Sequence, residues 1–188
     1  MHRLLNTFRI KFRLMSIRSC CSGGMALSHI SRFTEAKQEL QSLEKGMQVK
    51  VLNEPFDPFS SAYDACRVAD GILTGVLAEM QHDHPLARDA FKKAVEAEDS
   101  LIYDEPRDWP LPARQYLGNF YLNIGDFEDA INVFNRDLQI NPKNGWSLTG
   151  LKLAYQALHN ITAVEKVNIE LKNAWQIRDM PVEKPVFN

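Results

Sequence analysis

The sequence predicts an all-α protein built from repeated helical hairpins. Residues 111–144 contain two helical patterns separated by a Gly-Asp turn, and similar landmarks recur 43 residues upstream. Amphipathic segments that resemble weaker copies flank both. Internal repeats of this length are typical of helical solenoids. The chain has 188 residues, of which 45% are hydrophobic, so it is long enough for one sizeable core or a short array of hairpins.

The segment 111–144 carries the clearest pattern. Small residues at Gly118 and Ala130 predict that two antiparallel helices cross closely, and Gly125 supplies the turn between them. A proline then ends the second helix. The landmarks of the segment are Leu117, Gly118, Tyr121, Ala130, Phe134, Asn141 and Pro142.

These landmarks, at these offsets, resemble the tetratricopeptide repeat (TPR). The resemblance implies a short right-handed solenoid of antiparallel helical hairpins (TPR-like). The segment from Tyr103 to Trp109, together with Asn144-Gly145-Trp146, also looks like the C-terminal region of longer TPR proteins of unassigned function. That likeness covers about Ala65 to Trp175 and implies part of a larger superhelix or a shortened member of the family. It supplies no catalytic residues.

The other copies are less regular. Gly75, Ala87, Phe91 and Ala94 match Gly118, Ala130, Phe134 and Asp137 at a constant offset, and only Asp137 breaks the usual small residue. An insertion at 101–110 lengthens this period. An earlier hairpin is interrupted by Gly23-Gly24, and a last one, after Trp146, ends in an amphipathic helix at about 162–177.

The domain division follows from these patterns. We expect a basic leader at 1–21, a degenerate hairpin at 22–46, a proline-containing linker at 47–61, a TPR-like domain at 62–179 and a tail at 180–188. The leader is Arg-rich, acid-free and amphipathic, as mitochondrial transit peptides are. A disordered N-terminus and a remnant of an upstream repeat are the alternatives. The expected location is intracellular and cytoplasmic, with the mitochondrion as the alternative.

Charge and composition exclude several classes of function. The net charge is −2, and beyond the leader 17 basic residues stand against 24 acidic ones, which argues against a nucleic-acid partner. No uninterrupted apolar stretch is long enough for a transmembrane helix, so no membrane partner is expected. Three cysteines with neither a disulfide framework nor the spacing of a zinc site indicate a reducing compartment. We expect no cofactor.

Two clusters raise the question of chemistry. His82-Asp83-His84 has the residue types of a metal site, but histidines two apart cannot share one face of a helix, and a turn between helices explains them. Asp104, Glu105 and Asp108 are candidates for acid–base work or for binding a basic peptide. The alternative is a rigid insertion in which Asp108 caps the next helix. We expect neither catalytic nor metal-binding residues.

The candidate binding surface lies on the first helix of each hairpin. Its amides and aromatic ring suit an extended or helical peptide, whose backbone the amides would bind. Chaperone-tail clamps of the TPR family use a Lys and Asn set on this face; only Asn119 fits. The predicted residues are Gln115, Asn119, Asn123, Trp146, Thr149 and Gln156.

The sequence therefore predicts a non-catalytic module that binds a protein or peptide partner, or acts as a scaffold. One alternative is a structural fragment of a larger superhelix that self-associates. The other is a metal-dependent or hydrolytic enzyme.

Overall fold

The computed structural model describes residues 15, 19–53, 60–102, 112–176 and 182–186, and within these residues it contains helices and no strand. This confirms the all-α prediction. The chain divides into two compact units, Met1–Ala113 and Arg114–Asn188.

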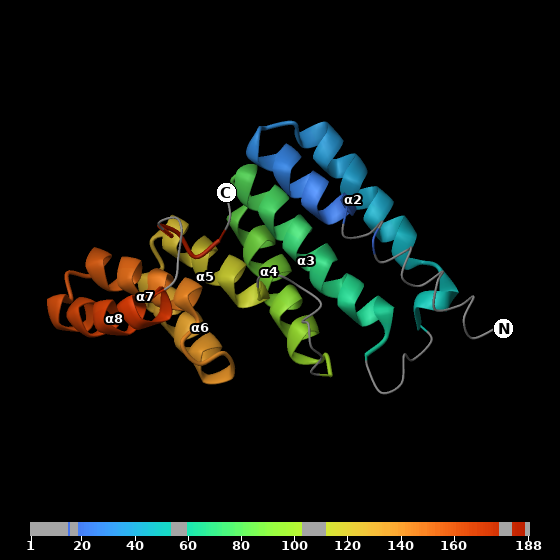
Figure 1. Cartoon of the computed structure of the whole chain (residues 1–188). Coiled ribbons are helices and arrows are strands. Elements are labelled where there is room, and N and C mark those ends of the chain that lie inside the picture. Colours follow the sequence, from blue (N-terminus) through green and yellow to red (C-terminus); the bar gives the residue numbers. More distant parts are fainter. Residues whose placement is uncertain (1–14, 16–18, 54–59, 103–111, 177–181, 187–188) are drawn as a thin grey trace. The chain divides into compact units, whose positions relative to one another are not determined.

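Unit 1 contains a helix at residues 19–29, then α2 (Phe33–Met47), a 3₁₀ turn η1 (Lys50–Asn53), α3 (Ala62–Met80) and α4 (His84–Asp99) (Figure 1). The central element is α3, which packs against α2, η1 and α4. Most of its residues are buried, as expected for a helix that is covered on several sides.

The boundaries of α3 and α4 follow from capping. The Ser61 hydroxyl accepts a 3.2 Å hydrogen bond from the amide N–H of Asp64 at the start of α3. The turn after α3 needs a positive φ at His82, and the Asp83 carboxylate then accepts a 3.1 Å bond from the N–H of Leu86. Asp83 is thus the N-cap of α4, and Pro85 occupies its first turn. Among the described residues, no group of three or more His, Cys, Asp or Glu side chains could hold a metal ion.

The close approach of α3 and α4 depends on glycines at two of the positions where the helices touch. A Cβ on Gly75 would lie 2.5 Å from the ring of Phe91, and one on Gly71 would lie 2.8 Å from the Cβ of Ala94. Larger residues at either position would force the helices apart.

The first hairpin differs from expectation at its glycine pair. The helix at 19–29 runs through Gly23 and Gly24. A side chain at position 24 would collide with Leu73 of α3. Gly24 therefore serves close packing and does not interrupt the helix. In the predicted linker, Leu52 of η1 is fully buried. The linker accordingly begins with a packed turn, while 54–59 lie outside the described residues.

Unit 2 contains α5 (Ala113–Ile124), which begins at the unit boundary, then α6 (Phe127–Ile140), α7 (Gly145–Ala157) and α8 (Ile161–Ala174). Packing joins α6 to α7 and α7 to α8. Left-handed residues make the turns between them: Gly125 at φ 82°, Lys143 at 64° and His159 at 54°.

The ring of Phe134 on α6 lies between two glycines. A Cβ on Gly118 of α5 would lie 2.4 Å from it, and a Cβ on Gly150 of α7 would lie 2.3 Å from it. The close approach predicted at Gly118 is therefore present. A second close approach occurs between α6 and α7, at Gly150.

Several predictions fall outside the described residues. They include all but residues 15 and 19–21 of the leader, the acidic residues Asp104, Glu105 and Asp108, and residues 177–181 around the start of the tail. No helix within the described part of the chain is long and apolar enough to span a membrane.

Candidate functional site

A buried carboxylate joins three helices of unit 2. Asp137 of α6 is fully buried. Its Oδ2 accepts hydrogen bonds from Gln115 Nε2 of α5 at 3.1 Å and from Ser147 Oγ of α7 at 2.6 Å. The amides of Asn141 and Asn144 donate to the same carboxylate at 2.7 and 2.8 Å. These bonds compensate the burial of its charge.

This network determines where Gln115 lies. Its side chain is fully buried, and its amide nitrogen donates to both Asp137 and Ser147. Gln115 was predicted on a partner-binding face, but in the structure its amide nitrogen holds helices together. Of the other predicted residues on α5, Asn119 is half-buried and Asn123 is exposed.

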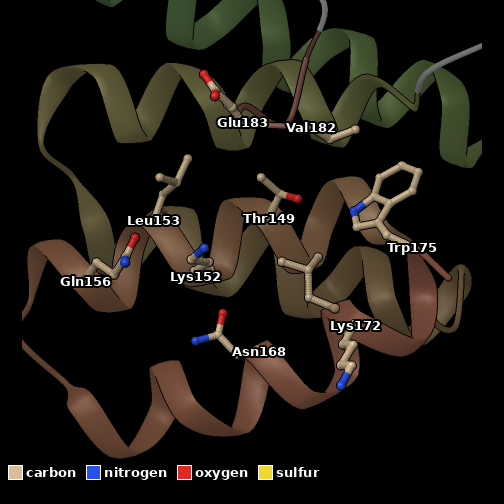
Figure 2. Close-up of a pocket in the computed structure, with 10 residues that line it drawn as sticks. Thr149, Lys152, Leu153, Gln156, Asn168, Lys172, Trp175, Val182 and Glu183 are labelled. Carbon is tan, nitrogen blue, oxygen red and sulfur yellow. The ribbon is translucent and has the colours of Figure 1, made fainter. Parts of the chain in front are cut away.

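A cavity of about 520 Å³ lies between α7 and α8 (Figure 2). Its size is within the range of ligand pockets. Each helix contributes residues at spacing i, i+3, i+4 and i+7, which places them on one helical face. Val182 and Glu183 complete the lining. The helical lining is Thr149, Lys152, Leu153 and Gln156 on α7, and Asn168, Leu171, Lys172 and Trp175 on and just after α8.

The helices that form the cavity begin at asparagine caps. The Asn144 side chain accepts a 3.0 Å bond from the N–H of Trp146, and the Asn160 side chain accepts a 3.1 Å bond from the N–H of Ala163. Both caps satisfy amide groups that a helix start leaves without partners.

Trp175 lines the cavity at one end (Figure 2). Its indole packs edge-on against Trp146, with ring centroids 5.7 Å apart. It also covers Gly145, where a Cβ would lie 2.4 Å from the indole. The Nε1 atom of Trp175 is buried without a hydrogen-bond partner. Trp146 therefore acts here as a support for Trp175, and Gly145 is small because the indole lies on it.

Most polar side chains of the cavity form no hydrogen bond within the described part of the chain. Thr149 is the exception, because its hydroxyl donates to the carbonyl of Gly145 at 2.8 Å. The side-chain amides of Gln156 and Asn168 make no hydrogen bond to the described part of the chain. A bound molecule would find amide donors and acceptors on both helices.

Two of the six predicted residues, Thr149 and Gln156, line this cavity. The residues on α8 were missed, because that helix lacks the landmarks of the repeat. Their spacing of i, i+3, i+4 and i+7, which matches that of α7, is a signal that would have found them.

Unit 1 has a second cavity, of about 400 Å³, lined by residues that include Glu44, Tyr63 and Asp70. Burial raises the pKa of Asp70, and the charge of Glu44 raises it further, while Lys93 opposes both. One oxygen of Asp70 is buried without a partner. Nearby, burial raises the pKa of the Cys21 thiol to about 12, with smaller contributions from Asp70 and Cys20. Glu44 and Asp70 thus line the same cavity, and neither forms an ion pair among the described residues.

The chain matches no protein-family model, and a search of the curated proteins finds no match. Inference about function therefore depends on the site.

Proposed function

We propose that this chain is a non-catalytic protein-interaction module of the TPR kind, which binds an extended segment of a partner protein in the cavity between α7 and α8. The observation that carries the proposal is the pair of matched stripes that line this cavity. Each stripe combines a leucine with an amide and a lysine, so apolar and polar contacts are available on both walls.

Extended peptides need both kinds of contact. Their backbone N–H and C=O groups require hydrogen-bond partners, and the amides of Gln156 and Asn168 are available for this. Their side chains gain affinity from apolar contacts, which Leu153 and Leu171 offer.

The TPR assignment is supported by the landmark pattern and by two glycine–phenylalanine contacts at equivalent positions. Gly75 lies against Phe91 in unit 1, and Gly118 lies against Phe134 in unit 2, each pair 16 residues apart by the numbering. Repeated close approaches of this kind are expected of stacked helical hairpins.

Site-specific photo-crosslinking in cells tests the proposal. A crosslinking amino acid replaces Gln156 inside the cavity, and in a matched control it replaces Glu165, which is exposed on α8 outside the cavity lining. We expect defined protein partners to be captured from position 156 and not from position 165. Capture of the same proteins from both positions, or of none from 156, would contradict the proposal.

Self-association is the competing interpretation. The last helix exposes Ile161 and Ile169, at 72% and 67% of their surface, and exposed apolar side chains favour association. Sedimentation velocity over a range of protein concentrations separates the two. A mass that rises with concentration, and returns to that of the monomer in Ile161→Glu/Ile169→Glu, would favour self-association.

A further inference from the structure

The α7–α8 cavity contains two lysines whose charges are not neutralised nearby. Lys152 is half-buried on α7, and Lys172 is exposed near the end of α8. Neither forms an ion pair with any described residue. Glu183 also lines the cavity, yet it makes no ion pair with either lysine. The site therefore offers two cations to whatever enters it.

Neither ammonium group has a carboxylate partner within the described part of the chain. A carboxylate from a bound molecule would supply that partner, and the attraction is stronger in a cleft than on an open surface. The unoccupied amides of Gln156 and Asn168 lie on the same walls.

We infer that the cavity binds an acidic, extended protein segment. This inference rests on the proposed function and specifies the chemistry of the partner. Carboxylates of the segment pair with Lys152 and Lys172, and its backbone bonds to the amides of Gln156 and Asn168. An apolar side chain of the segment packs between the leucines, Leu153 and Leu171.

Charge complementarity favours this occupant over other macromolecules. A basic segment would bring like charges together at both lysines. A nucleic acid offers anionic phosphates as well, but the chain has a net charge of −2 and places the carboxylate of Glu183 beside the cavity. Proteins that bind nucleic acid through phosphates instead present a broad basic surface.

Defined peptides test the inference on the full 188-residue chain. Three fluorescent peptides of equal length keep the same leucines and differ only in their polar positions, which are Asp and Glu, Asn and Gln, or Lys and Arg. Fluorescence anisotropy gives their affinities at low and high salt, with an oligothymidylate as the nucleic-acid arm. We expect the acidic peptide to bind at least about tenfold more tightly than the neutral one, and the difference to shrink as salt screens the charges.

Charge-reversal variants locate the effect. Lys152→Glu/Lys172→Glu should weaken binding of the acidic peptide by about tenfold or more. The matched control is Lys166→Glu, an exposed lysine on α8 that does not line the cavity, and it should change the affinity by less than about twofold. Unfolding curves of the variants confirm that each is folded before its affinity is compared.

The remaining outcomes are distinct. Equal binding of the acidic and neutral peptides, blocked by Leu153→Arg, would overturn the acidic preference and leave the proposed function standing. Binding of no peptide would contradict both. Tighter binding of the oligothymidylate would assign the cavity to a nucleic acid. Dimerisation that Lys152→Glu/Lys172→Glu abolishes would assign it to a second copy of the chain. Either assignment overturns the inference.

Discussion

The α3–α4 hairpin of unit 1 and the α5–α6 hairpin of unit 2 can be compared position by position. Both place a glycine against a phenylalanine ring, Gly75 against Phe91 and Gly118 against Phe134. One turn further along they differ. Gly71 meets Ala94 in unit 1, whereas the position equivalent to Ala94 in unit 2 is Asp137.

This difference changes how neighbouring helices are held. In unit 1 the contact is apolar and close, and its specificity comes from the absence of side chains. In unit 2 the carboxylate of Asp137 accepts hydrogen bonds from α5 and α7 as well as from its own loop. A hydrogen-bonded carboxylate restricts both the spacing and the orientation of the three helices, because each hydrogen bond has a preferred length and angle.

The largest effect should come from removing the carboxylate in unit 2. Asp137→Ala removes the acceptor of the Ser147 hydroxyl and of one N–H of the Gln115 amide, whose other N–H donates to Ser147. Each buried donor left without an acceptor costs about 2 kcal/mol. We expect the free energy of unfolding to fall by about 4 kcal/mol, measured by urea denaturation with tryptophan fluorescence. The stability of Asp137→Asn should lie between those of the wild type and Asp137→Ala, because an asparagine side chain keeps one acceptor oxygen. A loss of less than about 1 kcal/mol in Asp137→Ala would show that packing alone holds these helices.

The stability of unit 1 should instead fall at alkaline pH, because the thiol of Cys21 is buried in its core. The pKa of Cys21 is raised from 9.0 to about 12 in the folded chain, chiefly by burial. A raised folded-state pKa gives stability that is present below pH 9 and lost as the pH rises toward 12. Between pH 9 and pH 11 the loss should be about 2 kcal/mol.

The matched experiment compares the wild-type chain with Cys21→Ala by urea denaturation across this pH range. The variant should lack the part of the alkaline loss that comes from Cys21, although it is less stable at neutral pH because a buried group is smaller. Parallel pH profiles for the two proteins would contradict the prediction. The folded chain should also protect Cys21 from alkylation at pH 8, since only the thiolate reacts.

The same comparison shows what could be predicted from the sequence. The spacing shared by Gly75/Phe91 and Gly118/Phe134 predicted helical hairpins, because a close helix crossing needs a small residue opposite a large one. Asp137 was recognised only as an exception. Its partners Gln115 and Ser147 lie 22 and 10 residues away along the chain, and only the fold brings them together. For the same reason Gln115 was predicted on a surface.

Two of the six predicted binding residues line the cavity, although no cavity was predicted from the sequence. Thr149 and Gln156 are on α7, which was assigned to the binding face because it is the first helix of its hairpin. The opposite wall, with Asn168 and Trp175, comes from α8 and the residue that follows it, where the landmarks are absent. The stack of Trp175 on Gly145 spans 30 positions of the sequence and follows no local rule.

A smaller effect should separate the two glycine positions. Phe134 is confined by Gly118 on one side and Gly150 on the other, whereas Phe91 meets a glycine on one side, at Gly75. The ring of Phe134 therefore has less room to move away from a methyl group added at Gly118 than the ring of Phe91 has at Gly75. We expect Gly118→Ala to cost about 2 kcal/mol and Gly75→Ala about 1 kcal/mol, after the gain in helix propensity of alanine. Equal losses in thermal unfolding would show that the second glycine does not restrict Phe134.

The smallest effect sharpens the comparison, because it concerns a feature that the two units share. Asp83 caps α4 and Asn160 caps α8, each through a 3.1 Å bond to the amide three residues on. Both caps are exposed, so neither depends on the packing that distinguishes the units. Asp83→Ala and Asn160→Ala should each cost about 1 kcal/mol. Hydrogen exchange should rise in the first turn of α4 for one variant and of α8 for the other. If removing one cap cost much more than removing the other, the helix that it begins would contribute more to the stability of its unit than its exposed start suggests. If removing a cap cost nothing, that helix would be held by its packed face alone.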